Sequence, residues 1–206
     1  MKNYKFTENW FRDFSLINTF SFLDFEKELH ILEIGSFEGE STVWFLENVL
    51  NNPKSTITCI DPWTNYSQNS NSLNDYHSPN AEWDLSLYKT TFFYNIKESG
   101  FENKVITHQG LSQDILPKLI TLKNKYDIIF IDGNHVAPSV LTDGVMSWYL
   151  LKENGIIIFD DYEWDPDNDY PSTQSPKLAV DSFIENFSDY SKVIWSGYRK
   201  VIKKIK

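Results

Sequence analysis

The chain has 206 residues, of which 41% are hydrophobic and 16% aromatic, and its formal net charge at pH 7 is −10. This length is enough for one domain with a large core, and so acidic a chain repels phosphate backbones, which argues against nucleic acid as a partner. The lone cysteine, Cys59, excludes a disulfide framework and favours a reducing, cytoplasmic location.

The N-terminal segment, residues 1–29, is polar and aromatic, so we expect no signal peptide there. Its residues Phe11, Phe14, Ile17 and Phe20 recur at roughly helical spacing, which predicts a helical lead-in. No apolar run in the chain approaches the ~20 residues that a membrane-spanning helix needs, so we expect no membrane association.

Strands and helices alternate through the rest of the chain. Strands are predicted over His30–Ile34, Ser55–Ile60, Lys104–His108, Tyr126–Ile131 and Gly155–Phe159, followed by a hairpin of Lys192–Trp195 and Tyr198–Ile205. Helices are predicted over Ser41–Leu50, Leu85–Lys97, Ser112–Leu122 and Val136–Leu151, and a last one begins at Ser175-Pro176. This order predicts a single α/β domain over residues 1–206, with an open, doubly wound sheet and helices on both faces. In the tail, basic residues alternate with apolar ones over 199–206, which predicts a last strand with a solvated basic face.

A long polar stretch, residues 63–84, interrupts this alternation and carries several aromatic residues. A loop of this length inside a compact domain is usually functional or disordered. We interpret it as a lid-like insertion over a site, with a plain surface loop as the alternative.

The segment Ile31–Thr42 passes from an apolar strand through Gly35 and Gly39 into a helix. Glycine lets the backbone turn sharply and lets a ligand approach the main chain closely. A helix N-terminus at the carboxyl edge of an open α/β sheet is a common ligand site, so a nucleotide-type cofactor is expected here. The two glycines are four residues apart and do not form G-x-G-x-x-G, which disfavours an NAD-linked oxidoreductase.

Asp61 ends the second predicted strand, 22 positions after Gly39. An acidic side chain at this place can accept hydrogen bonds from both hydroxyls of a ribose. The alternative is a turn cap beside Pro62.

Three aspartates, Asp132, Asp160 and Asp161, follow the fourth and fifth predicted strands. Neighbouring strands would bring these carboxylates into one cleft, where they repel each other unless a cation neutralises them. Oxygen ligands suit Mg²⁺, Mn²⁺ or Ca²⁺, and loop or helix capping is the alternative role. His135, three residues past Asp132, could be a general base, a metal ligand or a helix cap.

Taken together, these motifs resemble those of class I S-adenosylmethionine-dependent methyltransferases. The segment Leu32–Thr42 resembles their first motif, and Cys59–Trp63 resembles their ribose-binding acidic motif. The pair Tyr126–His135 and Gly155–Tyr162 is similar to the metal-dependent O-methyltransferase branch, which includes catechol, macrolide and aminocoumarin sugar O-methyltransferases. The similarity runs from about Ile31 to the C-terminus.

The resemblance implies a Rossmann-like sheet of seven strands in the order 3-2-1-4-5-7-6, with strand 7 antiparallel. It implies S-adenosyl-L-methionine as cofactor, with these contacting residues: Glu33, Gly35, Ser36, Glu38, Gly39, Ser41, Asp61, Trp63, Gly110, Ser112 and Asp132. It also implies Mg²⁺ or another divalent cation on Asp132, Asp160 and Asp161. Glu33 and Glu38 would suit the amino group and positive sulfonium of the cofactor.

The base is either His135 or Asp132, because the catechol enzymes have a lysine at the position of His135 and the sugar enzymes are thought to use the metal aspartate. The expected function is metal-assisted methyl transfer to an oxygen of a small molecule, a sugar or a catechol-like diol. The alternatives are a metal-independent methyltransferase using His135 and a catalytically silent relative that only binds a ligand or partner.

The acceptor pocket is expected between the lead-in, residues 63–84 and residues 160–173, with aromatic walls of Tyr162, Trp164 and Tyr170. An aromatic N-terminal segment often mediates dimer contacts in this fold, so the sequence is compatible with a homodimer.

Overall fold

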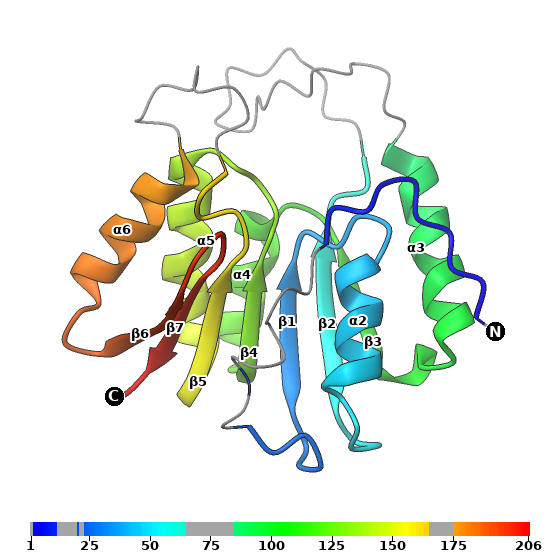
Figure 1. Ribbon diagram of the computed structural model, residues 1–206, viewed down its shortest axis with the longest axis horizontal. Helices are drawn as coiled ribbons and strands as arrows, with labels where there is room; N and C mark the ends of the chain where they lie inside the picture. Colours follow the sequence, from blue (N-terminus) through cyan, green and yellow to red (C-terminus); the bar gives the residue numbers. More distant parts are fainter. Residues whose placement is uncertain (1, 12–19, 21–22, 65–84, 165–174) are drawn as a thin grey trace.

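The computed structural model describes residues 2–11, 20, 23–64, 85–164 and 175–206. Seven strands form one sheet in the order β3-β2-β1-β4-β5-β7-β6 (Figure 1). The first five strands of this order are parallel, whereas β7 is antiparallel to both β5 and β6. The predicted strand order and the antiparallel β7 are therefore confirmed.

The observed elements lie close to the predicted ones. The strands are β1 (His30–Ile34), β2 (Thr56–Asp61), β3 (Val105–Gln109), β4 (Tyr126–Ile131), β5 (Leu151–Phe159), β6 (Ser191–Ser196) and β7 (Lys200–Lys204). The helices are α2 (Glu40–Asn48), α3 (Leu85–Ser99), α4 (Ser112–Thr121), α5 (Ala137–Leu150) and α6 (Pro176–Asn186), with a short 3-10 turn η1 (Glu102–Lys104) before β3. The main difference is that β5 begins at Leu151, which pairs with Tyr126 before an irregularity in the register. Asn154, within this stretch, has a positive φ of 63°.

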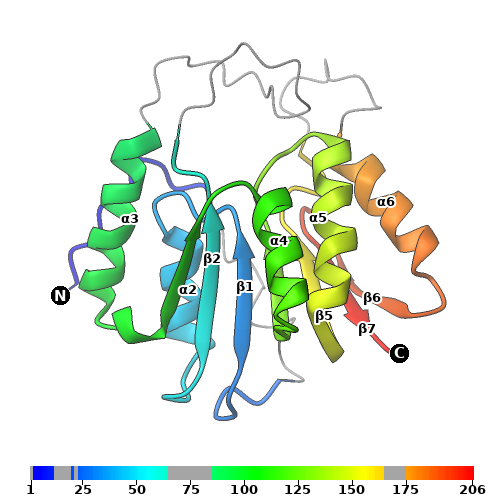
Figure 2. The ribbon, with the colours of Figure 1, turned by 180° about the vertical axis from the view of Figure 1, so that it is seen from behind.

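The helices cover both faces of the sheet, with α2 and α3 on one face and α4, α5 and α6 on the other (Figures 1 and 2). Successive residues of a strand point to opposite faces, so each strand contributes to two apolar layers. Ile31 packs in the layer that contains α2 and α3, and its neighbour Leu32 packs in the layer that contains α4, α5 and α6. Burial on both faces explains why these strands are almost entirely apolar.

The N-terminal residues 2–11, here called the N-terminal strap, contain no helix or strand and run beside α3 towards the carboxyl ends of the strands (Figure 1). Asn95 of α3 holds the strap by exchanging hydrogen bonds with both backbone groups of Lys5. The helix predicted in the lead-in falls largely on residues 12–19, and the predicted lid falls on 65–84, so both lie outside the described residues. No helix in the described part of the chain is long and apolar enough to cross a membrane.

The prediction of a solvated basic face in the tail is wrong for the first two residues of that segment. Arg199 and Lys200 are only 7% and 9% exposed. The hairpin of β6 and β7 brings Arg199 onto Asp160 at the end of β5, where the buried carboxylate needs a positive partner.

Candidate active site

The candidate site lies at the carboxyl edge of the parallel strands, where the loops after β1, β2, β4 and β5 meet. Its first part is the glycine loop, residues 35–39. Gly35 has a φ of +84°, and a Cβ at this position would lie 1.9 Å from the carbonyl oxygen of Asp132. Gly39 has the same φ and packs against the ring of Phe92. Gly35 therefore lets the loop press against the loop that follows β4, and Gly39 lets it turn tightly against α3.

Glu33 lies beneath the glycine loop and is fully buried. Its carboxylate accepts hydrogen bonds from the hydroxyls of Ser36, Ser41 and Thr42. Burial raises the pKa of Glu33, and the three hydroxyl donors oppose that shift. The structure thus uses Glu33, Ser36 and Ser41 to hold the loop, and their predicted contact with a cofactor stays a prediction.

Glu38 is 2% exposed, and one of its carboxylate oxygens, Oε2, accepts hydrogen bonds from the backbone N–H and the hydroxyl of Thr7 in the N-terminal strap. Its other oxygen, Oε1, has no hydrogen-bond partner among the described residues. The strap is therefore fastened directly to the glycine loop.

Asp61 joins the ends of β1 and β2. Its Oδ2 accepts the backbone N–H groups of Ser36 and Phe37, both at 2.9 Å, and its Oδ1 accepts that of Trp63 at 2.8 Å. Burial raises the pKa of Asp61, and these backbone donors oppose the shift. The structure shows the capping role, and because a carboxylate oxygen can accept two hydrogen bonds, Oδ1 keeps capacity for the predicted ribose contact.

Two non-glycine residues beside Asp61 have positive φ angles, 44° at Phe37 and 42° at Trp63. The indole N–H of Trp63 donates to the carbonyl of Phe37 at 2.8 Å, and Trp10 of the strap stacks on the Phe37 ring at 5.3 Å. Such strained residues persist only where surrounding contacts fix them, and they are frequent at functional sites. Phe37 is a residue of this loop that the sequence-based site prediction lacks, although its place between the two glycines is a signal. Trp63 is 2% exposed, so its ring packs in the core beside Phe92.

Gly110 and Ser112, the predicted adenine contacts, follow β3. Gly110 donates its backbone N–H to the carbonyl of Asp61 and has a φ of 152°. Ser112 begins α4 and its side chain hydrogen-bonds Asp143 of α5, a buried carboxyl whose pKa is raised to about 7 by burial. The adenine contacts stay predictions.

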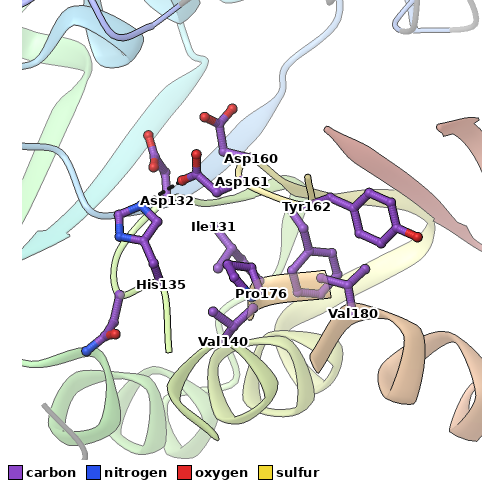
Figure 3. A pocket seen from close by; sticks show the side chains of 11 residues that line it. Ile131, Asp132, His135, Val140, Asp160, Asp161, Tyr162, Pro176 and Val180 are labelled. Atoms are coloured by element: carbon purple, nitrogen blue, oxygen red, sulfur yellow. Dashed lines mark hydrogen bonds and ion pairs between the residues drawn. The ribbon is translucent and has the colours of Figure 1, made fainter. Parts of the chain in front are cut away.

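The second part of the site, here called the acidic cluster, comprises Asp132, His135, Asp160 and Asp161 (Figure 3). The imidazole Nε2 of His135 lies 2.7 Å from Oδ2 of Asp161. One ligand atom from each of Asp132, His135 and Asp161 falls within 4.8 Å of the others, the spacing of a metal site. The structure thus brings His135, rather than Asp160, together with Asp132 and Asp161.

Asp160, the third predicted metal ligand, forms an ion pair with Arg199, and the adjacent Tyr198 donates its hydroxyl to Asp161 at 2.8 Å. Tyr198 and Arg199 are site residues that the sequence does not indicate. Its pattern predicts the hairpin that carries them, but their side-chain partners depend on the pairing register of β5 and β7.

The acidic cluster carries more negative charge than Arg199 balances. Burial, followed by the charges of Asp160 and Asp161, raises the pKa of Asp132 well above its usual range. Burial also raises the pKa of Asp160 to about 6, with Arg199 opposing the shift. Burial acts on Asp161 in the same direction, yet hydrogen bonds from His135 and Tyr198 hold its pKa below the usual value. Such a cluster can bind a cation or accept a proton.

A small pocket opens on this cluster, walled by Tyr162, Pro176 and Val180 (Figure 3). Trp164, another predicted aromatic wall, stacks on the imidazole of His135 with 4.9 Å between ring centroids. Tyr170 lies outside the described residues.

A glycine loop after β1 and an acidic residue after β2, on a sheet of this strand order, define the fold of class I S-adenosylmethionine-dependent methyltransferases. A family model described as a methyltransferase domain matches residues 32–162, which is more than half of the chain. The chain belongs to this family.

The chain is also similar to individual known proteins. A protein of Acanthamoeba polyphaga mimivirus described as uncharacterized is 32% identical over 155 residues, or 74% of this chain and 59% of its own length. The O-methyltransferase hkm8 of Aspergillus hancockii is 27% identical over 131 residues, or 64% of this chain and 42% of its own. The chain thus spans about three fifths of the first relative and about two fifths of the second. The O-methyltransferase TomG of Streptomyces achromogenes, solved with S-adenosylmethionine, shares the fold with a TM-score of 0.61 and 20% identity, over 88% of this chain and 75% of TomG.

Proposed function

We propose that this protein transfers a methyl group from S-adenosylmethionine to a hydroxyl oxygen of a small molecule. The observation that carries the proposal is the direct contact of the glycine loop with the acidic cluster, through Gly35 and the backbone of Asp132. This contact puts a cofactor-type loop beside groups that can accept a proton. The family match and the relative named as an O-methyltransferase support the same reaction.

The donor set of the acidic cluster fits a divalent cation. Asp132, His135 and Asp161 would hold it, because two partly buried carboxylates and an imidazole converge within 4.8 Å and the neighbouring charges of Asp160 and Asp161 raise the pKa of Asp132. When bound, such an ion would lower the pKa of the acceptor hydroxyl.

Residues of the chain would accept the proton, align the methyl donor and contact the acceptor. Asp132, whose pKa is raised, is suited to take the hydroxyl proton as the oxygen–methyl bond forms and the sulfur–methyl bond breaks, leaving S-adenosylhomocysteine. The glycine loop would fix the donor in line with the acceptor oxygen, an alignment that contributes several kcal/mol. Tyr162 and Trp164 supply aromatic faces that suit a sugar ring or a catechol-like diol.

A second candidate, a metal-independent methyltransferase, is favoured by the 2.7 Å contact between His135 and Asp161. In that arrangement Asp161 orients the imidazole, and His135 takes the hydroxyl proton directly.

The proposal is tested by mass-spectrometric detection of methyl transfer from S-adenosylmethionine to a panel of sugars and vicinal diols. We expect a methylated product that is lost with EDTA and restored by Mn²⁺ or Mg²⁺. Turnover that persists in EDTA and disappears in His135→Gln supports the metal-independent candidate instead. Heat on titration with S-adenosylhomocysteine but no product with any acceptor would indicate a silent relative.

A further inference from the structure

Two consecutive residues of the β6–β7 turn bind two consecutive aspartates at the end of β5. In the antiparallel ladder Phe159 pairs with Lys200, so the next positions place Arg199 beside Asp160 and Tyr198 beside Asp161. The observed contacts follow this register, because Arg199 pairs with Asp160 and Tyr198 donates to Asp161. The hairpin therefore acts on both carboxylates, but with different groups.

The partner of Asp160 is Arg199, whose charge is permanent and whose side chain is buried. Arg199 is 7% exposed, Asp160 is 6% exposed, and the guanidinium lies 5.0 Å from the ring of Phe11 in the N-terminal strap. A guanidinium does not lose its proton in proteins, so Asp160 keeps a cationic partner under all working conditions. The partners of Asp161 are the neutral hydroxyl of Tyr198 and the imidazole of His135, which is itself a candidate ligand, so neither draws Asp161 away from the site.

The two carboxylates also point differently. Asp161 is directed towards Asp132 and His135, whereas Asp160 is directed away from His135 (Figure 3). Within the described residues the convergent group is Asp132, His135 and Asp161, without Asp160.

We propose that Arg199 determines the cation specificity of the site by withdrawing Asp160 from it, leaving an Asp–His–Asp set that favours Mn²⁺ over Mg²⁺. Imidazole suits transition-metal ions, whereas Mg²⁺ prefers oxygen ligands, so removing one oxygen donor and using a nitrogen donor shifts the preference. This inference rests on the cation-assisted form of the proposed function.

The test compares two neighbouring, isosteric substitutions, Asp160→Asn and Asp161→Asn, by isothermal titration of the full chain with Mn²⁺. Asp161→Asn is expected to weaken Mn²⁺ binding at least about tenfold, and Asp160→Asn to change it less than about threefold. Equal weakening by both would overturn the inference and leave the cation-assisted function standing. Absence of Mn²⁺ binding to the unaltered chain, with S-adenosylhomocysteine still bound, would overturn both the inference and the cation-assisted form.

A second comparison measures the ratio of Mg²⁺ to Mn²⁺ dissociation constants directly. Arg199→Gln frees Asp160 and is expected to lower the ratio about tenfold, whereas Arg199→Lys keeps the charge and the ratio. The pair Asp160→Asn with Arg199→Gln contains no unpaired charge and is expected to restore the original ratio. An unchanged ratio in folded Arg199→Gln, checked by circular dichroism, would contradict the proposal. If that variant does not fold, the comparison of Asp160→Asn with Asp161→Asn decides.

Discussion

The buried carboxylates on the two sides of the site are stabilised by different kinds of partner. On the glycine-loop side, Glu33 accepts three hydroxyls and Asp61 accepts three backbone N–H groups. In the acidic cluster, Asp160 depends on the cation of Arg199 and Asp161 on His135. Neutral hydroxyl and backbone N–H donors make a rigid loop, whereas the ionisable groups of the acidic cluster make a site whose properties respond to protons and cations.

The largest effect is expected where the two sides touch. Gly35→Ala would place a Cβ 1.9 Å from the carbonyl oxygen of Asp132 at a φ of +84°, which forces the two loops apart. We expect a loss of about 4 kcal/mol in the free energy of unfolding, measured by urea denaturation.

Gly100→Ala is the matched control for this substitution. Gly100 has a φ of +77° with no atom within 4 Å of its added Cβ, so it reports the backbone cost alone, about 1 kcal/mol. If both substitutions cost the same, the close contact between the loops does not matter and the comparison of the two sides loses its structural link.

The next effect concerns Asp61. Asp61→Ala removes the acceptor of three backbone N–H groups and the predicted ribose contact, so we expect S-adenosylhomocysteine to bind at least about tenfold more weakly by isothermal titration. Asp24→Ala is the control, because Asp24 is exposed and remote from the loop. Unchanged affinity in Asp61→Ala would mean that this side of the site does not bind the cofactor.

Another buried carboxyl, Asp143 of α5, extends the comparison, because within the described residues one hydroxyl, that of Ser112, hydrogen-bonds it. Burial raises its pKa to about 7, so in the folded chain it holds a proton that the unfolded chain has already released. The stability that the protonated Asp143 contributes is therefore lost as the pH rises from the pKa of this carboxyl in the unfolded chain through about 7, its pKa in the folded chain.

Asp143→Asn replaces the carboxyl by a neutral amide and so removes the loss of stability that comes from ionising a buried carboxyl. Relative to the unaltered chain, the variant should gain about 2 kcal/mol of unfolding free energy between about pH 5.5 and about pH 8.5. A difference that does not change with pH would show that the hydroxyl of Ser112 suffices to stabilise the ionised carboxylate and that burial does not raise the pKa of Asp143.

The smallest effect is expected in the N-terminal strap. Thr7→Val removes the hydroxyl that donates to Glu38 at 3.1 Å but keeps the backbone donor, so we expect a cost of about 1 kcal/mol in thermal unfolding. A much larger loss would mean that the strap, rather than the loop's own hydrogen bonds, holds the glycine loop in place.

The sequence places the glycine loop and Asp61 at the ends of their strands, because these residues are close in the chain and local spacing predicts the turn. Their contact with a cofactor stays a prediction. The partner of Asp160 lies 39 positions away, and the contact depends on the register of an antiparallel pair, which apolar alternation in the tail does not specify. The basic residues of the tail therefore suggested a solvated face, although Arg199 is buried against an aspartate.

The role of His135 was open in the sequence for a related reason. Its spacing from Asp132 allowed a base, a ligand or a cap, and only the folded loop after β5 places Asp161 2.7 Å from its Nε2.

The most direct test of the account is titration of the unaltered chain with S-adenosylhomocysteine, with NAD as the comparison ligand. We expect one-to-one binding of S-adenosylhomocysteine and no heat from NAD if, as proposed, the glycine loop, Asp61 and the acidic cluster form one methyl-transfer site. Binding of NAD alone, or no binding of S-adenosylhomocysteine at about 1 mM, would contradict it.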